Sequence, residues 1–373
     1  MTWIAFFFLV HGIAYFFVPS DVHNEASPFK YIKYILILAF ITLSITENIR
    51  AKLWYFALWI PLYFYYSAIN KLGDPVFFVS YLLPFYFFLS PRHLMMVNWK
   101  NVILYTIIIC SIAGYTEIFF LKNHFYMYNR SLDAYRLVSI YLNPNNLGIT
   151  MALLTFAYII LYSGNQTMSL ILFVNGAVII FLSVSKTGYA VFGMLTLFVV
   201  YTYLTARKLS MRVRPRYVVL SVAVLPVVAY ALYRFVSDFD FSNTREISWA
   251  TLAVRFEGNA LFFDLVRQNF FFPWIHRPEN LDNMYIHLWG SFGLPFLLLF
   301  LFFNSVLLVW LRNSFAVVFL LIFLILGFTT DALYLWPIGY FYWGVAGVAV
   351  FQRSHRSAHS QLRIILKSCG IEH

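Results

Sequence analysis

Long apolar runs separated by short polar segments recur along the whole chain. Each run approaches the ~20 apolar residues that a helix needs to cross the hydrocarbon core of a bilayer. The runs are continuous and do not alternate between apolar and polar positions, which excludes a transmembrane β-barrel. We therefore expect an all-α polytopic membrane protein of about 12 transmembrane helices. The expected spans are residues 2–18, 31–46, 53–70, 75–90, 101–120, 147–163, 168–185, 188–206, 217–236, 284–310, 314–330 and 333–351.

Composition supports this interpretation. Hydrophobic residues make up 62% of the chain and charged residues 11%, whereas soluble domains carry roughly 25% charged residues. The first run has no basic segment ahead of it, so we interpret it as a span and not as a cleaved signal peptide. The two cysteines, Cys110 and Cys369, show neither a disulfide framework nor metal-ligand spacing. We expect no metal and no cofactor.

Basic residues gather in alternate connections, and the net charge is +11. Because short cytoplasmic loops are enriched in lysine and arginine, we assign these connections and both termini to the cytoplasm. This set comprises Arg50, Lys52, Arg92, His93, Lys100, Arg207, Lys208, Arg212, Arg214, Arg216, Arg312 and the basic tail 352–373.

The opposite connections then face the outside, and two of them are long. The first is segment 121–146. The second, loop 237–283, is the one place with room for a small subdomain, and its 250–268 stretch has apolar residues at helical spacing. Arg255 and Glu257 lie between those apolar positions, which indicates an amphipathic helix at the membrane surface. The chain shows no internal repeat, so we treat residues 1–373 as a single integral membrane domain.

The stretch RLVSIYLNPNNLG, residues 136–148, joins the first long external segment to an apolar run. Pro144 fixes its own φ and disfavours helix at Asn143, and the neighbouring asparagines can cap a first helical turn. Arg136 lies a few residues upstream. A cation beside a capped helix start at a membrane edge suits an anionic head group. The alternative is an ordinary loop-to-helix cap.

Other polar residues also fall on the external side. Lys186 lies in SVSKTGY, a tight turn between two spans, and either snorkels to the interface or points into a cavity. Glu117, near the outer end of the fifth span, is costly there unless paired, and Arg136 or Lys186 are its candidate partners. Arg255 pairs either with Glu257 or with a head group.

Asp282-Asn283-Met284-Tyr285 opens the tenth span, and His287 follows about one turn later. Asp282 either caps this helix or offers a carboxylate to the external face. His287 is either a packed polar residue or a second proton acceptor. Three cations beside a potential base fit a site that holds a diphosphate and deprotonates a hydroxyl group.

Four features appear in a fixed order along the chain. They are Arg136 ahead of Asn143-Pro144-Asn145 and Gly148; Ser185-Lys186-Thr187-Gly188 at an outer turn; Arg255 in a large external loop; and Asp282-Asn283-Met284-Tyr285 followed by Gly293-Leu294. In this order and topology, the chain resembles the O-antigen ligase and polymerase superfamily, which includes Wzy-type polysaccharide polymerases and lipid A-core ligases.

The resemblance implies a metal-independent transferase that acts on undecaprenyl-pyrophosphate-linked glycans at the periplasmic face of the bacterial inner membrane. Arg136, Lys186 and Arg255 would hold the pyrophosphate. Ligases of this superfamily carry a histidine immediately before the asparagine of the last motif. This chain has Asp282 there, with His287 out of register, which favours a polymerase. Lys186 also stands where an arginine is commoner.

We therefore expect a polysaccharide repeat-unit polymerase, with Asp282 as the first candidate for the general base, His287 the second and Glu117 the third. The expected partners are the lipid-linked donor and acceptor, the bilayer and a chain-length regulator, with no nucleic acid. A ligase is the first alternative. The second alternative is a lipid-linked oligosaccharide flippase. The polar groups of a flippase should line a path at mid-depth of the membrane, whereas the polar groups of this chain gather at the external ends of the spans.

Overall fold

Nearly all of the described chain is helical, as the sequence predicts. The computed structural model describes residues 1–13, 29–69, 75–120, 127–129, 134–141, 143–161, 166–205, 269–271, 283–311, 314–328, 330, 332–333 and 336–368. The predicted span 217–236 and the amphipathic stretch 250–268 lie outside these residues, as do Arg255 and Asp282.

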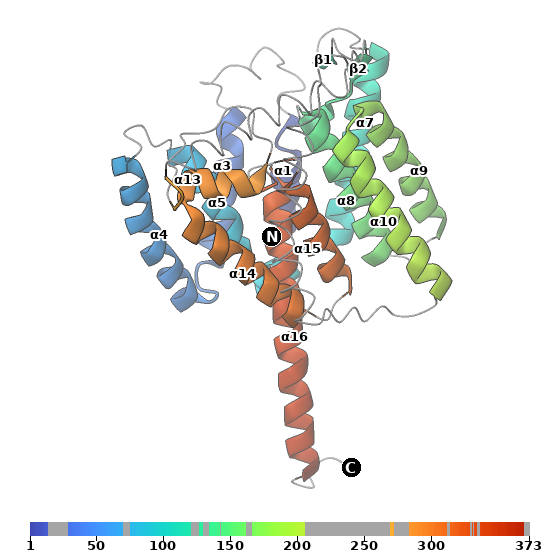
Figure 1. Ribbon diagram of the computed structural model, residues 1–373. Helices are drawn as coiled ribbons and strands as arrows, with labels where there is room; N and C mark the ends of the chain where they lie inside the picture. The colour runs from blue at the N-terminus through green and yellow to red at the C-terminus, as the bar shows by residue number, and fades with distance from the viewer. Residues whose placement is uncertain are drawn as a thin grey trace, which may run out of the picture.

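The elements follow one another as a series of helices interrupted by one short hairpin (Figure 1). They are α1 (Thr2–Val10), α3 (Phe29–Ser44), α4 (Ile49–Ile69), α5 (Pro75–Phe88), α6 (Pro91–Met95), α7 (Trp99–Phe120), β1 (Met127–Asn129), β2 (Ala134–Arg136), the 3-10 turn η2 (Ser139–Tyr141), α8 (Pro144–Leu161), α9 (Gln166–Ser183), α10 (Lys186–Thr205), α13 (Met284–Phe292), α14 (Leu294–Trp310), α15 (Ser314–Leu326) and α16 (Ile338–Ser368). The antiparallel pair β1–β2 was not predicted and pairs Met127 with Arg136.

Among the described residues, α7 and α9 are long and apolar enough to cross a membrane, and several other apolar helices are shorter. Large apolar side chains remain exposed along the outer faces of the helices. Trp54 on α4 is 73% exposed, Leu197 on α10 is 71% exposed, and Phe302 on α14 is 68% exposed.

Small residues set the closest helix contacts. A Cβ atom at Gly347 of α16 would lie 2.6 Å from the carbonyl oxygen of Phe88, so α16 packs directly on the end of α5. A Cβ atom at Gly176 of α9 would lie 2.6 Å from the hydroxyl oxygen of Thr155 on α8. Glycine at a crossing lets helix backbones approach closely, which is typical of helices packed in a membrane.

The predicted span 284–310 is two helices and not one. Gly293 separates α13 from α14 with φ 91° and ψ 162°, a region open essentially to glycine alone. Pro295 follows within the first turn of α14, where its missing N–H costs no hydrogen bond. Figure 1 shows α13 running across the bundle at a steep angle to α14.

Much of the basic tail is helical. Helix α16 continues without a break through residue 352 to Ser368, so most of the tail extends the last helix. Figure 1 shows this part of α16 projecting beyond the other helices, at the end of the molecule opposite the β1–β2 hairpin.

Candidate functional site

Helix α8 begins at the Asn-Pro motif, and the predicted cap is confirmed. The side-chain Oδ1 of Asn143 accepts hydrogen bonds from the backbone N–H groups of Asn145 at 2.8 Å and Asn146 at 3.3 Å. The first helical backbone bond runs from the N–H of Leu147 to the carbonyl oxygen of Asn143, at 2.9 Å. Pro144 occupies the first helical position, where the absent N–H has no intrahelical partner to lose.

Arg136 is the last residue of β2 and joins the end of α9 to the start of α8. Its guanidinium donates from Nε to the carbonyl oxygen of Ser183 and from Nη2 to that of Val184, both at 3.2 Å. Nη2 also donates to Oδ1 of Asn145 at 2.9 Å. Carbonyl oxygens at a helix C-terminus carry partial negative charge and lack intrahelical partners. Arg136 therefore has a structural role as a cap of α9.

Helix α10 begins directly beside α8. The hydroxyl oxygen of Ser185 accepts a hydrogen bond from the backbone N–H of Gly188 at 2.9 Å and so caps the helix. A Cβ atom at Gly148 would lie 2.7 Å from Cβ of Ser185, and one at Gly188 would lie 3.0 Å from Cα of Gly148. The two helix starts therefore touch because both positions are glycine.

Lys186 is the first residue of α10, and its side chain is exposed. It lies two residues after Val184, whose carbonyl oxygen accepts a hydrogen bond from Arg136. Two helix N-termini and two cations thus meet at one end of the bundle. The side chains of Asn143 and Ser185 already accept the N–H groups of Asn145, Asn146 and Gly188. The positive ends of the two helix dipoles still favour a bound anion. The arrangement can hold a group with several negative charges.

Glu117 is fully buried, and backbone N–H groups bind its carboxylate. Its carboxylate accepts backbone N–H bonds from Val138 at 3.2 Å and Ser139 at 2.8 Å. Both N–H groups belong to the turn that follows β2. Glu117 therefore holds the segment that follows Arg136 against α7.

Helix α13 begins at Met284, and Asn283 is its cap. Oδ1 of Asn283 accepts hydrogen bonds from the backbone N–H groups of Tyr285 at 3.0 Å and Ile286 at 3.1 Å. Its Nδ2 donates to the carbonyl oxygen of Phe328 at 3.4 Å. The hydroxyl group of Tyr285 donates to the carbonyl oxygen of Leu324. The cap that Asp282 could supply is thus supplied one residue later.

His287 lies inside the molecule, one turn into α13. It is 9% exposed, and its Nδ1 lies 3.3 Å from the hydroxyl oxygen of Tyr81 on α5. This contact holds α13 against α5. Sequence reasoning missed Tyr81, because a tyrosine within an apolar run carries no signal of a partner so far along the chain.

The connection between α15 and α16 receives hydrogen bonds from both asparagine-capped helices. Nδ2 of Asn146 donates to the carbonyl oxygen of Trp336, and Asn283 donates to that of Phe328. Figure 1 shows α13 and the β1–β2 hairpin toward the same end of the bundle. The structure therefore brings Arg136, Asn145 and Lys186 together and ties the starts of α8 and α13 to one connection.

In the described part of the chain, no cluster of three or more His, Cys, Asp or Glu residues could hold a metal ion. No model of a known protein family matches the chain, and no curated protein matches it either.

Proposed function

We propose that the chain is a membrane glycosyltransferase that polymerises undecaprenyl-pyrophosphate-linked oligosaccharide repeat units. One observation carries the proposal: the starts of α8 and α10 meet beside Arg136 and Lys186. A pyrophosphate presents several negatively charged oxygens, which cations and the positive ends of helix dipoles attract. The order of the four motifs, which resembles the O-antigen ligase and polymerase superfamily, supports the choice of this substrate.

The proposed setting is the bacterial inner membrane, with about 12 spans, both termini in the cytoplasm and the site at the periplasmic face. Exposed apolar side chains on α4, α10 and α14 support it, because hydrocarbon is the solvent that tolerates them. The basic tail supports the orientation, since α16 carries it away from the hairpin end of the molecule.

In the proposed reaction, a hydroxyl oxygen of the acceptor repeat attacks the anomeric carbon of the donor glycan. The bond between that carbon and the phosphate oxygen breaks, and the lipid pyrophosphate leaves with the electron pair. Lys186, Arg255 and the positive ends of the α8 and α10 helix dipoles stabilise the departing charge, and Arg136 holds the helices in place. The hydroxyl proton passes to a general base, with Asp282 as the first candidate and His287 as the second.

Glu117 takes a different role in this proposal from the one expected of it. Its carboxylate is fully buried and already accepts two backbone N–H bonds. We assign it to positioning the turn after Arg136 and not to proton transfer with the substrate.

Lys186→Ala is the sharpest test of the site. In the described part of the chain no hydrogen bond or ion pair holds the Lys186 side chain, so its removal leaves the fold intact. Arg136, by contrast, caps α9, and its loss would mix folding with binding. Because a hydrogen bond to a charged group contributes about 1.5–3 kcal/mol, we expect transfer to fall roughly 10- to 100-fold. Lys186→Arg should keep most of the activity.

The assay uses purified protein in vesicles that carry lipid-linked repeat units on one leaflet, and it measures glycan chain length and released lipid pyrophosphate. Arg50→Ala is the control, since Arg50 is also exposed and lies at the start of α4, a helix away from α8 and α10. Wild-type activity in Lys186→Ala removes Lys186 from the site. Exchange of repeat units between leaflets without chain growth would instead identify a transporter.

A further inference from the structure

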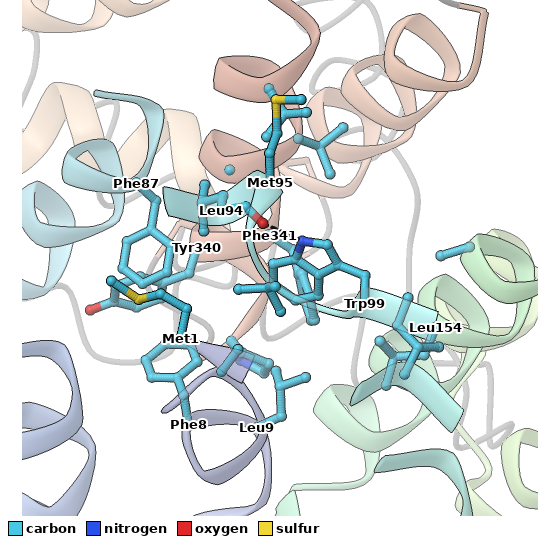
Figure 2. Close-up of a pocket in the computed structure, with 18 of the residues that line it drawn as sticks. Met1, Phe8, Leu9, Phe87, Leu94, Met95, Trp99, Leu154, Tyr340 and Phe341 are labelled. Carbon is cyan, nitrogen blue, oxygen red and sulfur yellow. Dashed lines mark hydrogen bonds between the residues drawn. The ribbon is translucent and has the colours of Figure 1, made fainter. Parts of the chain in front are cut away.

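A large apolar cavity lies between α1, α3, α5, α6, α7, α8, α15 and α16 (Figure 2). Its volume is about 440 Å³, within the range of roughly 300–1,000 Å³ typical of ligand sites. Apart from Gln352, its lining side chains are aliphatic, aromatic or methionine, including Phe8, Leu94, Trp99 and Phe341. Apolar cavities of even ~150 Å³ stay dry and accept apolar ligands. Hydrocarbon is therefore the expected filling.

The cavity reaches the surface beside α6. Met95 both lines the cavity and is 46% exposed, and Figure 2 shows it on the side away from Phe8 and Leu9. Arg92, one helical turn before Met95, is exposed and places its guanidinium 5.5 Å from the ring centre of Phe351, the neighbour of the lining residue Gln352. We call this opening the basic mouth.

A second exposed cation, Lys100, follows the lining residue Trp99 at the start of α7. The carboxylate of Glu47 contacts the backbone of Arg92, and the Glu47 side chain is 4% exposed. Glu47 accepts the backbone N–H bonds of Arg92 at 2.7 Å and His93 at 3.2 Å, and it pairs with the imidazole of His93. Its charge is thus engaged within the protein, and the exposed charges beside the mouth are positive.

An apolar cavity with a basic mouth matches an amphiphile with a hydrocarbon chain and a negatively charged head group. We propose that the cavity binds one acyl chain of an anionic phospholipid, with the phosphate at Arg92 and Lys100. Basic side chains at a membrane surface attract anionic head groups. The inference rests on the membrane setting of the proposed function but not on transferase activity. The lipid carrier is a different ligand, because its pyrophosphate is assigned to Lys186 and the starts of α8 and α10.

Gly344 of α16 offers a way to fill the cavity. A Cβ atom there would lie 3.4 Å from Cδ1 of Leu94, an ordinary contact, so Gly344→Leu extends a side chain into the cavity without a backbone clash. Gly193→Leu is the matched control. It adds the same side chain to an exposed helical glycine with nothing within 4 Å, on α10 and away from the cavity lining.

The experiment reconstitutes the full chain in vesicles of equal parts phosphatidylglycerol and phosphatidylcholine, extracts it into detergent and counts bound lipids by native mass spectrometry. We expect one phosphatidylglycerol on the wild type and on Gly193→Leu. Gly344→Leu should retain about tenfold less, because the added methylenes occupy the space of the chain. Arg92→Gln combined with Lys100→Gln should abolish the preference for the anionic lipid.

The proposal is overturned if the wild type retains no lipid, retains both phospholipids equally, or if Gly344→Leu binds as much as the control. Retention of a polyprenyl lipid from the expression host at this site would overturn it as well. If Gly344→Leu fails to elute as a folded protein, the proposal is still tested by comparing the phospholipid that the wild type retains with the one that the Arg92→Gln, Lys100→Gln variant retains. A protein that binds the phospholipid but transfers no glycan refutes only the proposed function.

Discussion

Single polar residues determine where the helices of the candidate site begin. Asn143 and Asn283 use the same arrangement, in which one side-chain oxygen accepts two backbone N–H bonds of the first turn. The first cap is predictable because proline follows it. For the second cap, Asp282 was one of the alternatives, since Asp and Asn cap helices about equally well and the pattern alone does not separate adjacent candidates.

The contact between the starts of α8 and α10 depends on the absence of a side chain at Gly148. We expect Gly148→Ala to lower the free energy of unfolding by about 1–3 kcal/mol, because the new methyl group meets Ser185. Gly193→Ala makes the same change in open space and should stabilise α10 by up to about 1 kcal/mol. Thermal unfolding in detergent measures both, and equal shifts in the two variants would contradict the close contact.

At the scale of elements, the break between α13 and α14 shows where an apolar pattern misleads. A continuous apolar run predicts one long helix, because periodicity does not register a single glycine or a proline in a first turn. Gly293 nevertheless ends α13 with φ 91° and ψ 162°. The break turns α13 across the bundle, where its first turn binds the end of α15.

Gly293→Ala should therefore destabilise the protein by about 1–3 kcal/mol, since other residues rarely adopt this backbone conformation. Gly344→Ala on α16 is the control, because its new methyl group makes an ordinary contact and its helical backbone accepts alanine. The measurement is again the thermal midpoint in detergent. If the thermal midpoint of Gly293→Ala matches that of the control, the break between α13 and α14 does not require glycine at this position.

At the scale of the whole molecule, the two ends of the bundle differ in chemistry. One end carries the β1–β2 hairpin, Arg136 and Lys186, and the other receives the basic extension of α16. Separation of this kind is what an orientation in a membrane requires, because short basic segments stay in the cytoplasm.

Cysteine labelling tests that orientation directly. In a background of Cys110→Ala and Cys369→Ser, we introduce Lys186→Cys or Lys100→Cys, both at exposed positions. A membrane-impermeant maleimide should label Lys186→Cys in intact spheroplasts, and Lys100→Cys only after the membrane is opened. Equal labelling of both in intact spheroplasts would contradict the topology and with it the external site.

The sequence by itself determined the helical class, the approximate bounds of most helices and the cap at Asn143, since apolar run length and capping act over a few neighbouring residues. Tertiary structure decided the rest. Glu117 binds backbone amides more than 20 positions away, Asn146 binds Trp336 at a separation of 190 residues, and the starts of α8 and α10 touch through Gly148. Such contacts depend on how helices pack, and no local pattern encodes which distant groups will then lie within reach.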